Sequence, residues 1–334
     1  MTDPTMRIGV IGGGAWGTAL AQVAARDGSP ARLWARESAV VDAINQTHEN
    51  APFLPGVPLS PLIAATGDLA AMAECDALML VVPAQYLRAV LDAVLAAMPG
   101  RDVPLVLCAK GIEAGTGKLI AEVARDLAPA APLAVLSGPT FAREVALGHP
   151  TAVTIASADA VLAQRLAQRL AMPMFRPYLS DDVVGAEIGG AVKNVLAIAC
   201  GVVDGAGLGQ NARAALIARG FAELTRFGLA RGARAETLTG LSGLGDLVLT
   251  CSSIASRNYS LGVALGQGRA AADILAERTS VAEGASTAPV LAQAARGVGV
   301  AMPVVDAVCA LLAGEPVRDV IEGLLARPIA AEFG

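Results

Sequence analysis

The chain has 334 residues, enough for two domains, and it is apolar (54% hydrophobic) but poor in aromatic residues (3%). Its net charge of −5, without a basic run, makes nucleic acid an unexpected partner. Five scattered cysteines and two histidines favour a reducing cytoplasm over a disulfide framework, and they predict no metal site.

An uncharged stretch near the N-terminus, Ile8–Ala25, has the composition of an export signal or a membrane span. It contains Gly12, Gly13, Gly14 and Gly17, which favour a sharp turn over a continuous apolar helix. We therefore expect a cytoplasmic protein with no export signal and no membrane insertion.

Short apolar runs alternate with helical patterns through the first half of the chain. The expected strands are Arg7–Gly12, Ala31–Ala35, Ala77–Val82, Leu105–Ala109, Leu133–Ser137 and Ala152–Ala156. The expected helices between them are Thr18–Arg26, Leu87–Met98, Lys118–Asp126 and Val161–Leu170. This alternation predicts a doubly wound α/β fold, in which helices cover both faces of a parallel sheet.

The first expected strand leads directly into a glycine-rich turn. The run Gly12-Gly13-Gly14-Ala15-Trp16-Gly17 follows the G-x-G-x-x-G pattern, and a helical pattern comes after it. Gly12 permits the tight turn, Gly14 lets the backbone approach a pyrophosphate, and Gly17 allows close packing of helix and strand. Because the helix N-terminus offers N–H groups to an anion, the turn predicts a bound dinucleotide and a Rossmann-type domain.

The second expected strand ends at Trp34-Ala35-Arg36. An arginine at this position can pair with the 2′-phosphate of NADP, whereas an acidic residue would bind the ribose of NAD. Glu37 follows immediately and weakens the distinction. We predict NADP(H) as the cofactor, with NAD(H) also accepted; the alternative for Arg36 is a solvated strand end.

Three other strand ends carry unusual residues, and ligands of parallel sheets bind beyond the carboxyl ends of the strands. Val82-Pro83-Ala84 closes one of these strands with a rigid turn. Lys110 follows one strand, with an exposed loop lysine as the alternative interpretation. Ser137-Gly138-Pro139-Thr140-Phe141-Ala142 follows another and offers exposed backbone and a hydroxyl group.

From about Asp181 the strand-like runs stop, and long Ala/Leu-rich segments follow. The expected helices are Val183–Val203, Ala212–Phe227, Ile254–Leu265, Ala285–Arg296 and Val304–Leu312. We therefore expect a dinucleotide-binding domain over residues 1–181 and an all-α substrate-binding and catalytic domain over residues 182–334.

The first of these helices carries Gly189-Gly190-Ala191-Val192-Lys193-Asn194, in which Lys193 is the only cation of the apolar run. Side chains lean over the residues three and four positions earlier, so the two glycines predict a groove beside the lysine. We expect this groove to be occupied. The alternative is close helix packing, with Lys193 extended toward solvent.

Two polar groups follow in the helical half. Gly240-Leu241-Ser242-Gly243-Leu244-Gly245-Asp246 is a glycine-rich loop that ends on a carboxylate, which could also serve as a helix N-cap. Ser256-Arg257-Asn258 is a compact set of hydrogen-bond donors suited to a phosphate, with a surface salt bridge as the alternative for Arg257.

These motifs together resemble the bacterial NAD(P)-dependent glycerol-3-phosphate dehydrogenases over essentially the whole chain. The matching segments are Gly12–Ala21, Phe53-Leu54-Pro55, Val81-Val82-Pro83, Lys110-Gly111-Ile112-Glu113, Ser137–Ala142, Gly189–Asn194, Asp204–Arg213, Gly243–Cys251, Ser256-Arg257-Asn258 and Val281-Ala282-Glu283-Gly284. Residue 15, commonly serine in the family, is alanine here.

The resemblance implies roles for individual residues. Lys193 would accept the proton of the substrate hydroxyl, with Lys110 and Asp246 beside the reacting carbon. The implied ligands of glycerol 3-phosphate are Lys110, Gly138, Thr140, Lys193, Asp246, Ser256, Arg257 and Asn258. The implied contacts of the dinucleotide are Gly12, Gly14, Ala15, Trp16, Gly17, Arg36, Lys110, Ala142, Arg257, Val281 and Glu283. The family also implies reduction toward glycerol 3-phosphate for phospholipid synthesis.

The chemistry required of Lys193 agrees with these roles. Oxidation of a secondary alcohol needs a base for the O–H proton, and an amine can act as one if its pKa falls toward neutrality. Burial lowers that pKa, and so do the nearby cations Lys110 and Arg257. Asp246 opposes the shift, so its expected task is to orient the lysine.

Two other functions fit parts of the sequence. One is a related two-domain dehydrogenase that acts on a 3-hydroxy acid or a keto acid. The group Ser256-Arg257-Asn258 disfavours it, because this group suits a phosphorylated substrate. The other is a non-catalytic dinucleotide sensor, which would not need Lys193 and Asp246 together. The apolar helical half fits either a homodimer surface or one large core.

Overall fold

The computed structural model describes residues 6–277 and 282–328, which form two compact units. The first unit contains the chain up to Ala109 together with Ile120–Ala186. The second contains Lys110–Leu119 and the chain from Glu187 onward. The units meet at residues 186/187, and residues 110–119 belong to the second unit. The domains expected over residues 1–181 and 182–334 stay a prediction.

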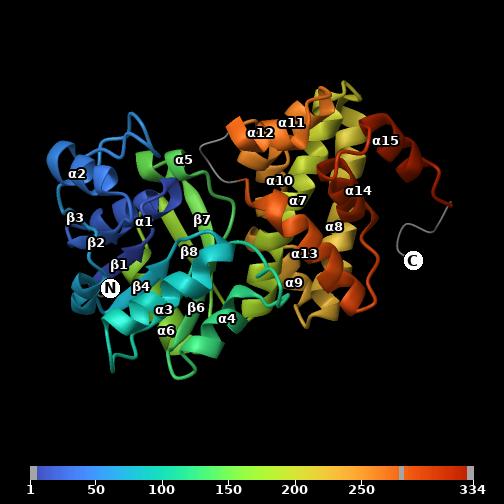
Figure 1. The fold of residues 1–334 in the computed structure, drawn as a ribbon. Coiled ribbons are helices and arrows are strands. Elements are labelled where there is room, and N and C mark those ends of the chain that lie inside the picture. The colour runs from blue at the N-terminus through green and yellow to red at the C-terminus, as the bar shows by residue number, and fades with distance from the viewer. Residues whose placement is uncertain (1–5, 278–281, 329–334) are drawn as a thin grey trace. The chain divides into compact units, whose positions relative to one another are not determined.

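An eight-stranded sheet in the order β3-β2-β1-β4-β5-β6-β7-β8 forms the centre of the first unit (Figure 1). Its strands are β1 (Ile8–Ile11), β2 (Ala31–Trp34), β3 (Ile63–Thr66), β4 (Ala77–Leu80), β5 (Leu105–Leu107), β6 (Leu133–Ser137), β7 (Thr151–Ala156) and β8 (Phe175–Ser180). The predicted Rossmann-type α/β fold is therefore confirmed.

The sheet is parallel except at one place, where β6 and β7 pair antiparallel. The helix between them, α5 (Ala142–Leu147), has only six residues. It spans roughly 9 Å, less than the roughly 17 Å of a five-residue strand. A parallel crossover must return along the whole strand, so this short helix does not complete one.

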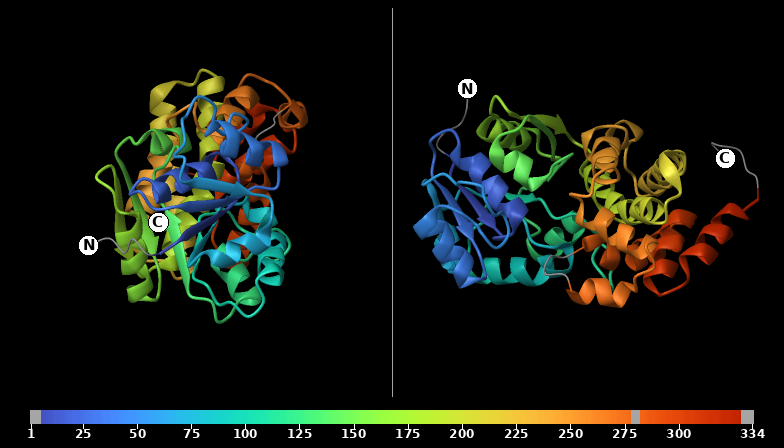
Figure 2. Two further views of the ribbon diagram at one scale, coloured as in Figure 1. Left: turned by 90° about the vertical axis from the view of Figure 1, so that its left-hand side faces the viewer. Right: turned by 90° about the horizontal axis from the view of Figure 1, so that it is seen from above.

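Helices cover both faces of the sheet (Figure 2). Alternate strand residues contribute to two separate cores, which the period-2 geometry of strands requires. One core packs residues of α1 (Ala15–Ala25), α2 (Ser38–Thr47), α5 and α6 (Ala160–Leu170). The other packs residues of α3 (Leu87–Ala97), α4 (Ile120–Leu127) and the short helix η1 (Leu69–Glu74). A short turn, η2 (Ala84–Tyr86), precedes α3.

The described part of the second unit is helical, as predicted. Its elements are the C-terminal part of α7 (Val183–Gly205), α8 (Gly209–Ala230), α9 (Ala235–Leu238), the π-helical turn η3 (Leu241–Gly245), α10 (Asp246–Thr250), α11 (Arg257–Gly266), α12 (Ala271–Glu277), α13 (Glu283–Gly297), α14 (Pro303–Leu312) and α15 (Val317–Leu325). In the described residues, only α7 is long and apolar enough to cross a membrane, and 89% of its most apolar window is buried inside the protein. This is consistent with the prediction of no membrane insertion.

Four glycines bring α7 and α11 into direct backbone contact. A Cβ on Gly201 would lie 2.1 Å from the carbonyl oxygen of Tyr259, and one on Gly262 would lie 2.0 Å from that of Ile198. Gly205 of α7 and Gly266 of α11 repeat these contacts one turn further along, against the carbonyl oxygens of Val263 and Val202. Because no side chain fits between these helices, the crossing fixes the helix that carries Lys193 against the helix that begins at Arg257.

Candidate active site

The glycine-rich turn of the first unit has the geometry that the sequence predicts. Gly12 has a φ of +129°, and a Cβ there would lie 2.4 Å from the carbonyl oxygen of Val81. A Cβ on Gly17 would lie 1.9 Å from the oxygen of Gly12. By contrast, a Cβ on Gly14 would meet no atom within 4 Å. The backbone at Gly14 is thus open to a ligand, and the flanking glycines shape the turn.

Helix α1 begins at this open backbone. Gly14 is its N-cap residue and provides no side-chain hydrogen bond to the first turn, which starts with Ala15 and Trp16. The indole N–H of Trp16 is buried and has no hydrogen-bond partner among the described residues. Uncapped N–H groups at a helix N-terminus suit an anion, so the turn fits the pyrophosphate of a dinucleotide.

The other predicted residues of the first unit also lie on strand ends. Arg36 follows β2; its side chain is 81% exposed and its guanidinium pairs with Glu37 at 2.8 Å. Gly138 follows β6 with a φ of +152°, and the hydroxyl of Thr140 donates to its carbonyl oxygen at 3.3 Å. Ala142 is the first residue of α5.

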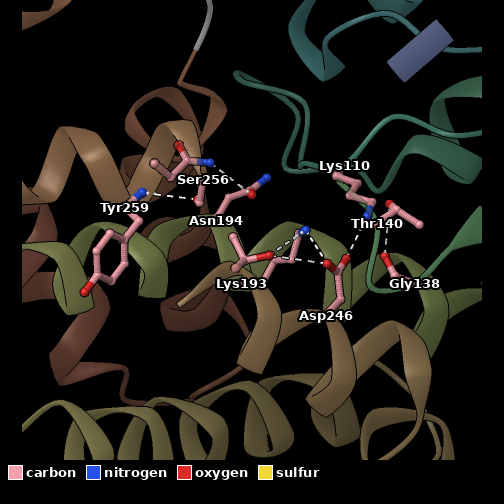
Figure 3. A network of polar contacts seen from close by, with 10 residues as sticks. Lys110, Gly138, Thr140, Lys193, Asn194, Asp246, Ser256 and Tyr259 are labelled. Atoms are coloured by element: carbon pink, nitrogen blue, oxygen red, sulfur yellow. Dashed lines mark hydrogen bonds and ion pairs between the residues drawn. The ribbon is translucent and has the colours of Figure 1, made fainter. Parts of the chain in front are cut away.

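The second unit contains a buried carboxylate between two lysines (Figure 3). The side chain of Asp246 has no exposed surface. Its Oδ1 accepts a hydrogen bond from Nζ of Lys193 at 2.5 Å, and its Oδ2 accepts one from Nζ of Lys110 at 2.6 Å. The N-cap alternative for Asp246 is wrong, since the residue lies inside its helix and its side chain binds the lysines. The alternative of an exposed Lys110 is also wrong, because its side chain is 14% exposed.

The ammonium group of Lys193 is held in a defined direction. Besides Asp246, it donates to the hydroxyl of Thr250 at 3.0 Å, and Thr250 itself donates to Asp246 at 3.3 Å. These are its two partners among the described residues, so one of the three Nζ positions is left for another acceptor. The side chain is 7% exposed, which excludes the expected alternative of a lysine extended into solvent.

Burial lowers the pKa of Lys193 from 10.5 to about 8. Asp246 raises this pKa and Lys110 lowers it, as the sequence predicted. Arg257 was also expected to lower the pKa of Lys193, but it is not among the main causes of the shift. A pKa near 8 is closer to the neutral range that favours an acid–base group than the ordinary value of a lysine.

The predicted open groove beside Lys193 is filled by backbone. A Cβ on Gly189 would lie 2.1 Å from the carbonyl oxygen of Ser242 in the π-helical turn η3. Gly243 of the same turn approaches Leu238 equally closely, at 1.9 Å from its carbonyl oxygen. The alternative of close packing is thus correct for Gly189. Its effect is to fix the turn that precedes Asp246, and with it the carboxylate that holds Lys193.

The group Ser256-Arg257-Asn258 lies at the N-terminus of α11. The hydroxyl of Ser256 caps the helix by accepting from the N–H of Tyr259 at 3.2 Å. Asn258 is buried; its Nδ2 donates to Oδ1 of Asn194 at 3.0 Å, and its Oδ1 accepts from the N–H of Gly284 at 2.9 Å. This amide joins the residue after Lys193 to the start of α13, where Glu283 is the first residue. Val281 lies outside the described residues.

Two residues of the site were not predicted. Thr250 binds Lys193 and stands four positions after Asp246, so both lie on one face of α10. Asn194 was quoted within a motif, but its bond to Asn258 joins residues far apart in the sequence. The four-residue spacing of Asp246 and Thr250 could have indicated the role of Thr250. No feature of the sequence indicated that Asn194 pairs with Asn258.

Comparison with known proteins identifies the family. The family model described as NAD-dependent glycerol-3-phosphate dehydrogenase N-terminus matches residues 7–163, and the corresponding C-terminus model matches residues 182–322. A protein of Sphingopyxis alaskensis named glycerol-3-phosphate dehydrogenase (NAD(P)+) 1 is 63% identical over 325 residues, 97% of either chain. This chain belongs to the NAD-dependent glycerol-3-phosphate dehydrogenase family.

Other members of the family agree with this assignment. A glycerol-3-phosphate dehydrogenase (NAD(P)+) of Novosphingobium aromaticivorans is 63% identical over 331 residues and 98% of either chain. The crystal structure of glycerol-3-phosphate dehydrogenase from Coxiella burnetii has a TM-score of 0.93 at 37% identity and covers 97% of this chain and 100% of its own. The predictions of an oxidoreductase and of a nicotinamide dinucleotide cofactor are thereby confirmed.

Proposed function

We propose that this dehydrogenase interconverts sn-glycerol 3-phosphate and dihydroxyacetone phosphate, with Lys193 as the acid–base group. The observation that carries the proposal is the buried ammonium of Lys193, held by Asp246 and Thr250 with a pKa lowered to about 8. In oxidation, its neutral amine takes the proton of the C2 hydroxyl. In reduction, its ammonium returns that proton to the forming alkoxide.

The remaining position on Nζ determines where the substrate oxygen lies. Asp246 and Thr250 occupy two directions around the nitrogen, so the proton moves along the third. A bound nicotinamide would supply the hydride donor or acceptor for C2 of the substrate. The chain contributes the orientation of the hydroxyl and the movement of its proton.

Lys110 completes the electrostatics of this site. Two ammonium groups and one carboxylate give the cluster a net charge of +1 (two positive charges less one negative) while Lys193 is protonated. A positive, buried cluster stabilises the negative charge that develops on the substrate oxygen during reduction. Asp246 therefore has a positioning role, as it holds both lysines without contributing a proton.

The phosphate of the substrate is assigned to Ser256, Arg257 and Asn258 at the N-terminus of α11. The helix has 10 residues, and its N-terminus carries partial positive charge. We expect Arg257→Ala to raise KM for dihydroxyacetone phosphate about tenfold or more, as the loss of a charged hydrogen bond implies. An effect on kcat with an unchanged KM would contradict this anchoring role.

The other predicted contacts, Gly138, Thr140, Ala142 and Glu283, stay proposals that rest on the family resemblance. We also propose that NADP(H) is the preferred dinucleotide, that the enzyme supplies glycerol 3-phosphate for phospholipid synthesis, and that it works in the cytoplasm. The homodimer stays a prediction beside the alternative of one large helical core.

The test is NADPH oxidation with dihydroxyacetone phosphate, followed by the absorbance of NADPH. We expect turnover in the wild type and a loss of roughly 10²–10⁴-fold in Lys193→Ala, with the affinity for NADPH kept. Lys118→Ala is the matched control, because this lysine belongs to the same unit and is not the partner of Asp246 in either of the two lysine ion pairs. Near-normal turnover of Lys193→Ala would overturn the acid–base assignment. Oxidation of hydroxy acids in place of glycerol 3-phosphate would favour the related dehydrogenase, and NADPH binding without turnover would favour a sensor.

A further inference from the structure

The loop of residues 48–59 in the first unit presents one fully buried polar side chain to the glycine-rich turn. The loop begins where His48 ends α2 in the left-handed conformation, with a φ of +52°. It closes on itself through a hydrogen bond from the N–H of Leu59 to the carbonyl oxygen of His48, at 2.8 Å. Inside this loop, Asn50 has no exposed surface.

Every polar atom of the Asn50 amide is used. Its Nδ2 donates to the carbonyl oxygen of Gly13 at 2.8 Å and to the hydroxyl of Thr18 at 2.7 Å. Its Oδ1 accepts from the N–H of Phe53 at 3.3 Å. Because a carbonyl oxygen only accepts, the contact with Gly13 fixes which side of the amide faces the turn. The family resemblance and the sequence motifs gave this residue no role.

We propose that Asn50 is a positioning residue for dinucleotide binding, acting through the peptide group between Gly13 and Gly14. A trans peptide is planar, and its C=O and N–H point in opposite directions. By holding the oxygen of Gly13, Asn50 turns the N–H of Gly14 away from the loop. Gly14 is also the residue whose backbone is open to 4 Å, where the pyrophosphate is expected.

The second hydrogen bond ties the same amide to helix α1. Thr18 is fully buried, and its N–H donates to the carbonyl oxygen of Gly14 at 2.9 Å in the first turn of the helix. Asn50 thus links the peptide group before Gly14 to the helical turn after it. The direction of the N–H groups that meet the anion is set before the ligand arrives, which reduces the ordering cost of binding.

The rest of the loop is held independently of Asn50. The carbonyl oxygen of Pro55 accepts from Arg143 of α5 at 2.6 Å, and the N–H of Gly56 donates to Glu49 at 2.7 Å. A substitution at Asn50 therefore leaves other anchors of the loop in place. This makes a change in ligand affinity separable from a collapse of the loop.

The chain offers a matched control in Asn45. Its amide also bridges two backbone groups of the first unit: Nδ2 donates to the carbonyl oxygen of Ala65, and Oδ1 accepts from the N–H of the same residue, both at 2.9 Å. These contacts join α2 to β3 and do not involve the glycine-rich turn. Asn45→Leu removes the same chemistry from a side chain whose hydrogen bonds are with Ala65 and not with the glycine-rich turn.

The experiment is a fluorescence titration of Asn50→Leu, Asn50→Asp and Asn45→Leu with NADPH in the absence of substrate. We expect both Asn50 variants to raise Kd for NADPH at least tenfold, about 1.4 kcal/mol, and Asn45→Leu to change it less than about twofold. Steady-state rates should show KM for NADPH raised, with kcat at saturating NADPH and KM for dihydroxyacetone phosphate unchanged.

Several outcomes would overturn the inference. An unchanged Kd in both Asn50 variants, or an equal rise in Asn45→Leu, would show that Asn50 has no special effect on the turn. A rise in Asn50→Asp alone would show that charge, not orientation, matters. If neither Asn50 variant folds, Thr18→Val, which removes only the hydroxyl partner, should raise Kd severalfold, and an unchanged Kd there would contradict the role.

The inference rests on the proposed cofactor, and the titration separates the two. A wild-type protein that does not bind NADPH would overturn the cofactor assignment itself. A wild type that binds NADPH beside Asn50 variants that bind it equally well would overturn only the positioning role. The substrate assignment does not enter the titration.

Discussion

Gly14 of the first unit and three helical glycines of the second unit have opposite uses. In the first unit, Gly14 leaves open space beside its backbone, with no atom within 4 Å of the place where a Cβ would stand. In the second unit, Gly189, Gly201 and Gly262 are each closed by a carbonyl oxygen at 2.0–2.1 Å. One glycine exposes the backbone to a ligand, whereas the others let two backbones meet. Spacing in the sequence does not distinguish these uses: a groove was expected beside Lys193, and at Gly189 it is filled by the backbone of Ser242.

The largest effect is expected where backbone meets backbone. Gly262→Ala would force a methyl group against the oxygen of Ile198, and we expect a loss of about 3 kcal/mol in the free energy of unfolding, at the upper end for overpacking. Thermal or denaturant unfolding measures it. The control is Gly323→Ala in α15, where a Cβ meets nothing within 4 Å. This change should stabilise by about 0.5–1 kcal/mol. Equal effects of the two substitutions would remove the distinction.

Gly14→Ala tests the open glycine. Its φ of −71° and ψ of 177° suit alanine, so we expect the unfolding temperature to stay unchanged. The new methyl group would stand where the pyrophosphate approaches, and Kd for NADPH should rise about tenfold. Titration with NADPH and a thermal melt on the same sample check both parts. A clear loss of stability with normal affinity would place Gly14 among the packing glycines.

The buried site behind Gly189 should show its lowered pKa in the rates. The neutral fraction of Lys193 rises about tenfold per pH unit below its pKa of about 8 and then levels off. Oxidation of glycerol 3-phosphate, which needs the neutral amine, should accelerate up to about pH 8. Reduction of dihydroxyacetone phosphate, which needs the ammonium, should decline above it. Profiles of kcat/KM in both directions between about pH 7 and 10 test this, and flat profiles would contradict it.

The same shift affects stability with a definite sign. The folded pKa of Lys193 lies below its ordinary value of 10.5, so the folded protein binds fewer protons between about pH 8 and 10.5. The contribution of this group to stability therefore increases as pH rises through that window. Comparison of the wild type with Lys193→Met in unfolding experiments at pH 8 and 10 isolates this contribution.

The smallest effect is expected at Arg36. Its guanidinium is mostly exposed and already paired with Glu37, so a 2′-phosphate gains only a solvent-screened contact. We expect Arg36→Ala to lower the preference for NADPH over NADH by about threefold to fivefold, within the range of an exposed pair. The kcat/KM values for both dinucleotides give this ratio. An unchanged ratio would remove Arg36 from cofactor selection.

The sequence predicted the sheet where its strands are buried on both faces, and it failed at the edges. The two strands that were missed, β3 and β8, are the two edges of the sheet. An edge strand needs no continuous apolar run, and it tolerates a proline such as Pro177 in β8. The antiparallel pairing of β6 and β7 was not predicted either. The length of α5 indicates it only when this helix is compared with the length of the neighbouring strand.

Charge and spacing in the sequence were enough to predict part of the candidate site. Lys193 and Asp246 stood out as single charges in apolar or glycine-rich segments, and their contact follows. The π-helical turn η3 fills the space beside Gly189, and no residue pattern predicted this turn. The roles of Thr250 and Asn50 arise from contacts with partners that the motifs did not pair with them.

The allocation of residues 110–119 has a practical consequence for dissecting the molecule. The chain passes from one unit to the other at residues 109/110, 119/120 and 186/187, so no single cut separates two complete halves. A C-terminal fragment that starts at residue 182 would lack Lys110. Its buried Asp246 would then pair with Lys193 alone, whereas in the intact protein it pairs with both lysines. Adding residues 110–119 as a free peptide would then test whether the cluster of Lys110, Lys193 and Asp246 can be restored by complementation.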